Sequence, residues 1–190
     1  MKALSDSHLY GILDLGYVPP AGAPAMLEAM LRGGVDIVQL RAKNVPPEAT
    51  ASLARTLLPL TRAAGVPFIL NDHPALAGEL GLTGAHVGQD DRPVAEARAL
   101  AGPGAWIGKS THSLAQAVAA EKEGADYIGF GPLFATPTKP DYTPIGLEEI
   151  RAVHERVSLP IFCIGGIKRE NLPTILAAGA RRVVIVSGIL

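Results

Sequence analysis

The sequence predicts a (β/α)₈ barrel, in which eight parallel strands alternate with helices. Short apolar runs rich in β-branched residues alternate with Ala-, Leu- and Glu-rich segments of helical period along the whole chain. Runs that are apolar throughout are typical of parallel strands buried on both faces. Polar side chains follow nearly every run, which favours a barrel, because its strand ends all meet at one mouth. The alternative, an open doubly wound sheet, would concentrate such residues at a single crevice.

Eight apolar runs are the expected strands. They are residues 8–14, 35–41, 67–70, 85–88, 106–110, 126–128, 161–164 and 182–187. The sixth run is followed by residues 129–140, whose two glycines and three prolines predict an extended loop.

Segments of helical period separate these strands. Helices are expected at residues 23–32, 47–64, 113–123, 146–156 and 170–178, with a short helix before the fourth strand. Ser113 is a suitable N-cap, with Gln116 three residues later as in a capping box. Pro59 should kink or divide the second helix. Eight strands with seven intervening helices make a barrel that lacks its last helix, so residues 1–190 are expected to form one domain, short at its C-terminal end.

Charge and composition exclude several classes of protein. The chain has 17 Lys+Arg against 18 Asp+Glu and no basic stripe, so nucleic acid is not an expected partner. It has no signal-like N-terminus and no bilayer-length apolar stretch, so we expect no membrane contact and a cytoplasmic location. Cys163 is the only cysteine and should be buried in a strand, which excludes an intramolecular disulfide and a cysteine-based zinc site. An uncovered barrel wall would favour a homo-oligomer.

Three polar residues at alternate positions end the second expected strand: Gln39, Arg41 and Lys43. Side chains two residues apart on a strand point the same way, so all three should face the mouth. Two cations and an amide suit a diphosphate. The alternative is a solvated strand end that binds nothing.

Two carboxylates, Asp72 and Asp91, follow the third and fourth expected strands, which are neighbours in a barrel. Beside phosphate-binding cations they suggest Mg²⁺, because that ion keeps several waters and takes one or two carboxylates plus substrate phosphates. The alternative is that they cap the helices that follow.

Two other stretches also carry groups suited to anions. Thr136, Thr138 and Lys139 supply two hydroxyls and an ammonium to the loop after the sixth strand, a set suited to phosphate oxygens. Small residues in 165–166 and 186–188 end the seventh and eighth strands, where barrels commonly hold a phosphate on backbone N–H groups. Two anion sites, one with a metal, imply a diphosphate substrate and a monophosphate partner. The alternatives are a rigid surface loop and glycines that only serve tight turns.

The whole chain resembles the thiamine phosphate synthase family. The matching motifs stand at the expected strand ends; they are Gln39-Leu40-Arg41-Ala42-Lys43, Asn71-Asp72, His86-Val87-Gly88-Gln89-Asp90-Asp91, Ser110-Thr111-His112, Thr136-Pro137-Thr138-Lys139, Ile164-Gly165-Gly166-Ile167 and Val186-Ser187. The resemblance implies a (β/α)₈ transferase that joins 4-amino-2-methyl-5-hydroxymethylpyrimidine diphosphate to a thiazole phosphate and releases diphosphate.

The resemblance also implies a role for each matching residue. Mg²⁺ would be bound by Asp72 and Asp91. The pyrimidine diphosphate would be bound by Gln39, Leu40, Arg41, Ala42, Lys43, Asn71, Ser110 and Lys139. The thiazole phosphate would be bound by Thr136, Pro137, Thr138, Gly166, Val186 and Ser187. No protein nucleophile is required, because diphosphate leaves first and the thiazole nitrogen captures the cation. Catalysis would then rest on positioning and on charge neutralisation by Mg²⁺, Arg41, Lys43 and Lys139, with Ser110 also among the expected catalytic residues.

Two features depart from the family pattern. Leu13 stands before Asp14 where the family usually has Thr, which leaves the role of Asp14 open. The missing last helix would hold the N–H groups of Gly188 and Ile189 less firmly. A related thiazole tautomerase would instead use His112 as acid and base without a metal, and a non-catalytic thiazole-phosphate-binding protein would bind phosphate without turnover. The paired carboxylates and Lys139 favour the synthase.

Overall fold

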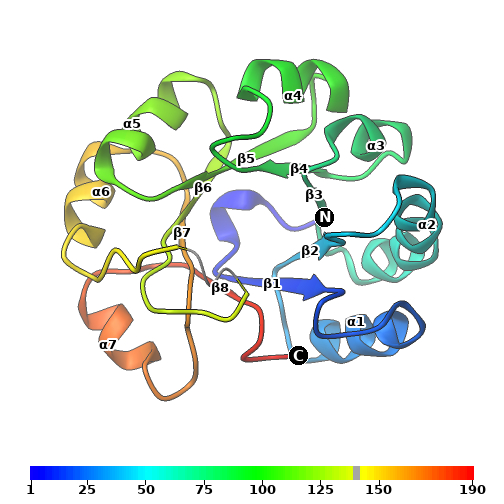
Figure 1. Cartoon of the computed structure of the whole chain (residues 1–190), viewed down its shortest axis with the longest axis horizontal. Coiled ribbons are helices and arrows are strands. Elements are labelled where there is room, and N and C mark those ends of the chain that lie inside the picture. Colours follow the sequence, from blue (N-terminus) through cyan, green and yellow to red (C-terminus); the bar gives the residue numbers. More distant parts are fainter. Residues whose placement is uncertain (139–141) are drawn as a thin grey trace.

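The computed structural model describes residues 1–138 and 142–190 as a closed barrel of eight parallel strands (Figure 1). The strands are β1 (Leu9–Asp14), β2 (Ile37–Arg41), β3 (Phe68–Asn71), β4 (Gly84–Val87), β5 (Trp106–Thr111), β6 (Tyr127–Phe130), β7 (Ile161–Cys163) and β8 (Val183–Ile185). Each strand pairs with the next and β8 pairs with β1, so the sheet has no open edge. The expected barrel is confirmed, and the open doubly wound sheet is wrong.

Seven α-helices of the described residues surround this barrel, as Figure 1 shows. They are α1 (Ala23–Arg32), α2 (Pro47–Ala64), α3 (Pro74–Glu79), α4 (Val94–Ala101), α5 (Leu114–Lys122), α6 (Ile150–Arg156) and α7 (Leu172–Ala177), with 3₁₀ turns η1 (Leu4–Asp6) and η2 (Pro20–Gly22). Both α1 and α2 have the bounds expected from the sequence. α4 lies where the helix count requires a helix but the sequence pattern gave no bounds. The described residues after β8 form turns rather than a helix.

Pro59 does not divide α2, which runs without a break from Pro47 to Ala64. The proline lies on the exposed side of the helix, where water can hydrogen-bond the carbonyl that lacks its usual partner. The opposite face buries Ala51, Ala54 and Leu57 against the barrel. Packing of that face keeps the helix continuous, so the expectation of a division is wrong.

Helix caps explain two other boundaries. The Ser113 hydroxyl accepts the Gln116 N–H at 3.3 Å, which confirms the expected N-cap of α5. The Gln116 side chain reaches back to the N–H of His112 rather than to that of Ser113, so the capping box is shifted by one residue. α6 begins at Ile150 instead of 146, because Gly146 has a left-handed φ of 74° that a helix cannot include.

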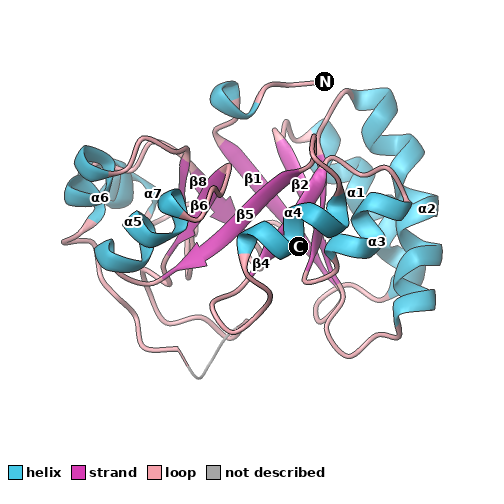
Figure 2. Ribbon diagram, turned by 90° about the horizontal axis from the view of Figure 1, so that it is seen from above, coloured by secondary structure: helices cyan, strands magenta, loops and turns pink. Residues whose placement is uncertain are grey.

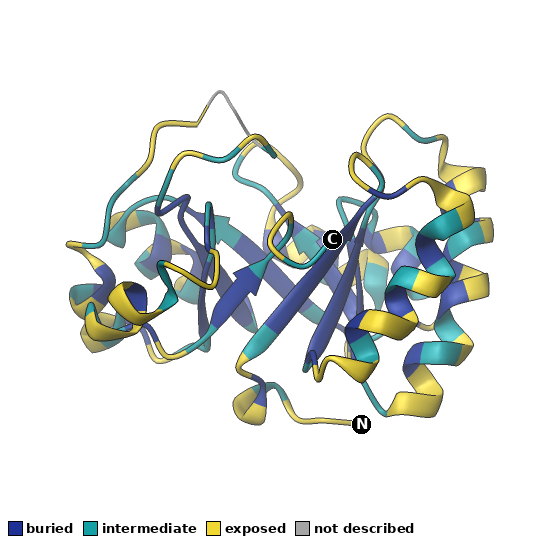
Figure 3. Cartoon of the chain, turned by 90° about the horizontal axis from the view of Figure 1, so that it is seen from below, coloured by how far each residue is buried: buried dark blue, intermediate teal, exposed yellow. Residues whose placement is uncertain are grey.

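Two apolar cores hold the fold together. One lies between the strands and the helices, where the inner faces of the helices are buried and their outer faces exposed (Figure 3). The other fills the barrel interior with Tyr10, Tyr127 and Phe162, whose rings meet at 5.5–5.9 Å between centroids. Leu4 of η1 packs against this inner core, and the N-terminus lies at the end of the barrel opposite the arrowhead of β5 (Figure 2). The inner core therefore forms the floor of the cavity above it.

The strands are not paired over equal lengths. β1 and β2 are in register over five residue pairs, from Tyr10–Ile37 to Asp14–Arg41. β7 and β8 pair at one position, Cys163 with Val183, next to a hydrogen bond from the Cys163 N–H to the Arg182 carbonyl. The β7–β8 seam is the least extensively paired seam of the described barrel.

Cys163 is fully buried in β7, as expected, and burial raises the pKa of its thiol to about 12. Among the helices of residues 1–138 and 142–190, none combines the length and apolar character needed to cross a bilayer.

Candidate active site

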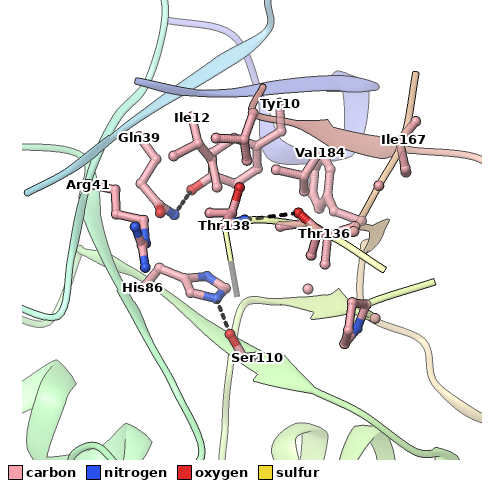
Figure 4. Close-up of a pocket in the computed structure, with 18 of the residues that line it drawn as sticks. Tyr10, Ile12, Gln39, Arg41, His86, Ser110, Thr136, Thr138, Ile167 and Val184 are labelled. Atoms are coloured by element: carbon pink, nitrogen blue, oxygen red, sulfur yellow. Dashed lines mark hydrogen bonds between the residues drawn. The ribbon is translucent and has the colours of Figure 1, made fainter. Parts of the chain in front are cut away.

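Two cavities adjoin at the mouth of the barrel, on the side of the carboxyl ends of the strands. The inner cavity lies over the aromatic floor; its lining includes Tyr10, Ile12, Gln39, His86, His112, Tyr127, Thr136, Phe162, Gly165, Gly166, Ile167, Val184, Val186 and Ser187 (Figure 4). The outer cavity is lined by Lys43, Asp72, Gly88, Gln89, Asp90, Asp91 and Tyr142. Arg41, Asn71, Ser110 and Thr138 line both cavities. These four shared residues make the two cavities parts of one site.

Arg41 is held in place by a carboxylate at the end of the neighbouring strand. β1 and β2 are in register at Asp14 and Arg41, and Asp14 Oδ2 accepts a hydrogen bond from Arg41 Nη1 at 2.6 Å. The other oxygen of Asp14 accepts the N–H of Gly16 at 2.8 Å. The Asp14 side chain is only 2% exposed. Asp14 therefore holds the Arg41 guanidinium between the two cavities. The role of Asp14 was open in the sequence analysis.

The outer cavity brings together the opposite charges expected from the sequence. Lys43, which follows β2, forms an ion pair with Asp72, which follows β3. Asp91 Oδ2 accepts the N–H of Gly88 at 2.6 Å and so closes the turn after β4. Neither carboxylate caps a helix, because α3 and α4 begin at other residues and have no side-chain cap. The capping alternative is therefore wrong for both residues.

Asp72 has an unusual backbone conformation. Its φ is 63°, in the left-handed region that non-glycine residues rarely adopt. Its N–H donates to the carbonyl of His86 on β4 at 2.9 Å, which holds the turn against the neighbouring strand. Strained backbone of this kind concentrates at functional sites. In this conformation the carboxylate lies in the outer cavity beside Lys43.

The carboxylates of the outer cavity fit the needs of Mg²⁺. Among the described residues, Asp72 and Asp91 each use only Oδ2 for a side-chain contact, which leaves Oδ1 of each for a ligand. Residues 1–138 and 142–190 contain no group of three or more His, Cys, Asp or Glu side chains that could bind a metal ion together. A cation that takes one or two carboxylates and completes its shell with water and phosphate oxygens suits this set.

At the end of β7, backbone rather than long side chains lines the inner cavity. Gly165 and Gly166 follow β7 with left-handed φ values of 101° and 64°. A Cβ on Gly166 would lie 2.7 Å from Phe134 Cβ and 2.9 Å from the Ala135 carbonyl oxygen. Glycine is therefore required here, where the loop after β6 passes over the end of β7. Val186 and Ser187 follow β8 and line the same wall.

The loop after β6 contributes two hydroxyls. The Thr136 hydroxyl accepts the Thr138 N–H at 3.3 Å, a local turn drawn in Figure 4. The Thr138 hydroxyl also pairs with Tyr17 of the loop after β1 at 2.8 Å. This contact joins the loops that follow β1 and β6, two strands that do not pair with each other. Lys139, the third member of this set, lies outside the described residues.

A chain of hydrogen bonds, fully buried at its Gln39 end, crosses the floor of the inner cavity. Gln39 Nε2 donates to Tyr10 Oη at 2.8 Å, and Tyr10 Oη lies 3.0 Å from Tyr127 Oη. Tyr127 Oη lies 3.3 Å from His86 Nδ1, and His86 Nε2 lies 3.0 Å from Ser110 Oγ. Figure 4 shows its two ends, Gln39 with Tyr10 and His86 with Ser110. The chain joins two expected substrate-binding residues, Gln39 and Ser110, through three residues that had no expected binding role.

His112 lines the inner cavity and is held by two contacts. Its Nδ1 contacts the carbonyl oxygen of Gly131, and its ring lies 4.9 Å from that of Tyr142 between centroids. A ring nitrogen close to a carbonyl is a donor, so Nδ1 carries the proton in this arrangement.

Three expected binding residues line neither cavity. Leu40 is fully buried, Ala42 is 8% exposed, and Pro137 faces solvent. Gln39 and Arg41 point into the barrel while Leu40 between them points toward the helices, as strand alternation requires. Side chains of these three residues cannot contribute as Gln39 and Arg41 do, which leaves only their backbone for a ligand.

The sequence analysis did not identify Tyr10 or Tyr127 as site residues, nor the hydrogen bonds that His86 makes inside the barrel. A polar group on an otherwise apolar strand could have indicated these residues. Gln39, His86, Tyr10 and Tyr127 all lie at inward-facing strand positions. Such residues inside a barrel must find hydrogen-bond partners across it. The particular partners depend on strand register, which the sequence does not state.

This chain resembles known proteins over nearly its whole length. A family model described as thiamine monophosphate synthase matches residues 9–189. The thiamine-phosphate synthase of Shouchella clausii is 44% identical over 183 residues, which are 96% of this chain and 88% of that protein. The corresponding protein of Chloroflexus aurantiacus is 44% identical over 186 residues, covering 97% of this chain and 86% of its own length.

Solved structures agree with the sequence comparisons. A thiamine phosphate pyrophosphorylase from Pyrococcus furiosus superposes with a TM-score of 0.85 at 34% identity, over 95% of this chain and 85% of that one. A tryptophan synthase α-subunit from the same organism has a TM-score of 0.74 at 14% identity, a likeness of fold alone. With the family model spanning nearly all of its length, this chain belongs to the thiamine monophosphate synthase family.

Proposed function

We propose that this protein couples 4-amino-2-methyl-5-hydroxymethylpyrimidine diphosphate to a thiazole phosphate, with release of diphosphate and with Mg²⁺ as cofactor. The observation that carries the proposal is the sharing of Arg41, Asn71, Ser110 and Thr138 between the two cavities. A substrate with a ring in the inner cavity and a diphosphate in the outer one would place its scissile bond beside these residues.

The outer cavity suits the diphosphate. Arg41 and Lys43 supply positive charge, and Asp72 and Asp91 supply oxygens for a metal. Bound Mg²⁺ would neutralise part of the charge that develops on the departing diphosphate. Lys43 contacts Asp72 in this structure, so both its ammonium and the carboxylate stand where the phosphates would lie. Arg41 is pre-oriented by Asp14 and needs no rearrangement to contact them.

The inner cavity suits flat rings and a single phosphate. Its floor of Tyr10, Tyr127 and Phe162 is apolar and rigid, while the backbone at Gly165 and Gly166 approaches the wall closely. Exposed N–H groups at glycine turns and the hydroxyls of Thr136 and Ser187 are suitable partners for phosphate oxygens. The two aromatic substrates would therefore meet above this floor.

The residues favour a substitution in which the diphosphate departs first. The described part of the chain offers many side chains suited to phosphate at the mouth, which fits a reaction that needs charge neutralisation more than a protein nucleophile. A pyrimidine-methyl cation formed in the inner cavity would be captured by the nitrogen of the thiazole held next to it. The protein then contributes positioning and charge stabilisation, which together can supply most of a rate enhancement.

Diphosphate release tests the proposal directly. The purified protein is supplied with both substrates, with Mg²⁺ or with EDTA, and diphosphate and thiamine phosphate are measured together. Release that needs both substrates and the metal, with thiamine phosphate in equal amount, supports the proposal. Binding of the thiazole phosphate without any turnover would support a non-catalytic protein instead. We further propose a cytoplasmic location and association into a homo-oligomer, the latter testable by light scattering.

A further inference from the structure

In one direction of the hydrogen-bond chain across the inner cavity, every hydroxyl hydrogen from Tyr10 to His86 has an acceptor within the chain. Gln39 Nε2 can only donate, so Tyr10 Oη accepts from it. The one proton of Tyr10 is then directed to Tyr127 Oη, 3.0 Å away. The one proton of Tyr127 is in turn directed to His86 Nδ1 at 3.3 Å.

This order fixes the tautomer of His86. A ring whose Nδ1 accepts a proton from Tyr127 is neutral and carries its own hydrogen on Nε2. Nε2 therefore donates to Ser110 Oγ at 3.0 Å. A doubly protonated ring would donate from Nδ1 to Tyr127 Oη. Tyr10 already donates to the same oxygen, so the hydrogen of the Tyr127 hydroxyl would then have no acceptor in the chain.

The surroundings preserve the direction. Gln39, Tyr10 and Tyr127 are at most 2% exposed, so water does not compete for these groups. Burial raises the pKa of both tyrosine hydroxyls, so each remains a phenol with one proton to donate. Edge contacts of both rings with Phe162, at 5.5 and 5.7 Å, hold them in place.

We infer that Tyr127 and His86 are positioning residues that fix the Ser110 hydroxyl as a hydrogen-bond donor toward the bound pyrimidine diphosphate. Because Ser110 Oγ already accepts from His86, its own hydrogen is free to point into the cavity, where Ser110 lines both parts of the site. The hydroxyl then presents a donor to an acceptor atom of the substrate without rotating. This inference rests on the proposed function for the identity of the substrate, but not for the direction of the chain.

The tautomer of His86 is measurable without turnover. The chain has five histidines, and ¹⁵N-histidine labelling with a His86→Asn variant for assignment identifies the His86 ring nitrogens by NMR. We expect the neutral Nε2–H form in the wild type at pH 7. The Tyr127→Phe variant should lose this preference. The Tyr10→Phe variant should keep it, because Tyr127 still has its own proton to donate, and it serves as the matched control for loss of a buried hydroxyl.

Kinetics test the link to Ser110. We expect Tyr127→Phe to lower kcat/KM for the pyrimidine diphosphate about tenfold, as for one lost hydrogen bond, and to leave the KM for the thiazole phosphate unchanged. In a Ser110→Ala background the same substitution should have almost no further effect, because the two residues act in one chain.

The results of these experiments can overturn either the inference or the proposed function. An Nδ1–H or doubly protonated His86 in the wild type overturns the inference, as does a full tenfold effect of Tyr127→Phe in the Ser110→Ala background. Equal damage by Tyr10→Phe and Tyr127→Phe would also overturn it in favour of a purely structural floor. A wild type with the Nε2–H tautomer but no synthase turnover would refute the proposed function and leave the direction of the chain established.

Discussion

Asp14 and Arg41 face each other across β1 and β2, with Asp14 Oδ2 2.6 Å from Arg41 Nη1. The Asp14 side chain is buried, and the Arg41 side chain is 15% exposed at the junction of the two cavities. Geometry of this kind leaves some guanidinium N–H groups available for a ligand while the side chain is held still. Under the proposed function, the pair would link the stability of the barrel rim to the binding of the diphosphate.

Replacing Asp14 by Asn should impair both properties. The amide keeps the shape of the side chain but removes the charge beside Arg41, and loss of one partner of a buried ion pair costs about 3 kcal/mol. We expect the KM for the pyrimidine diphosphate to rise about tenfold, with the free energy of unfolding lowered. Urea denaturation and steady-state kinetics measure the two effects. Asp6→Asn, at an exposed carboxylate of η1, is the matched control. A destabilised Asp14→Asn protein with unchanged KM would show that Asp14 supports only the fold.

Asp72→Gly should separate stability from activity. Glycine adopts the 63° φ of this position without strain, and the ion pair that is lost involves a half-exposed Lys43, so it contributes little. We expect stability to stay equal or to rise by up to about 1 kcal/mol, Mg²⁺-dependent turnover to disappear, and thiazole phosphate binding to persist.

Asn44→Gly is the matched control for Asp72→Gly. Asn44 has a φ of 61° and is the other described non-glycine residue with a positive φ. It should gain similar stability and keep its turnover. Thermal unfolding and metal-titrated kinetics give both readings. Parallel loss of metal dependence and of thiazole phosphate binding in Asp72→Gly would argue that the residue only shapes the turn.

Lys139→Ala should lower turnover by about 10² or more, because the ammonium stabilises negative charge on the leaving diphosphate. The expectation comes from the sequence motif, since Lys139 lies outside the described residues. Single-turnover measurement with both substrates at saturation isolates the chemical step. Lys122→Ala, at the last turn of α5, is the control. A Lys139→Ala protein with normal turnover would remove this lysine from the catalytic set.

His112→Ala should be tolerated, with turnover reduced less than about fivefold. The histidine contacts a backbone carbonyl and the Tyr142 ring, so its loss removes one hydrogen bond at the rim. Coupled assay of thiamine phosphate formation measures the effect, and His112→Asn shows whether a side-chain donor to Gly131 restores any loss. Complete inactivation by both substitutions would revive the acid–base role expected of a tautomerase.

The sequence predicted the fold well where a single pattern dominates. α1 and α2 have the expected bounds because their apolar faces are long and their ends carry clear signals, such as Gly65 with its left-handed φ after α2. α4 is short, and its buried residues are limited to Val94 and Ala97, too few to mark its ends. The position of Pro59 on the solvent face decides its effect, and that face follows from tertiary packing.

The site was predictable in its residue types and less so in its contacts. Gln39, Arg41, Asn71, Ser110 and Thr138 converge as expected, because strand ends in a parallel barrel share one mouth. The partner of Arg41 depends on the register that places Asp14 opposite it. The link from His86 to Tyr127 crosses the barrel interior, between strands that are not neighbours. Contacts of this kind have no local sequence signal.

The single paired position between β7 and β8 has a consequence for the motions of the barrel. Local opening should begin at this seam, so the amides of Val183–Ile185 should exchange with solvent faster than those of β1 and β2. Gly166 and Ser187 stand at the two sides of the same seam and both line the inner cavity. A phosphate held between them would act as a cross-link, and slower amide exchange in β8 would then report that the thiazole site is filled.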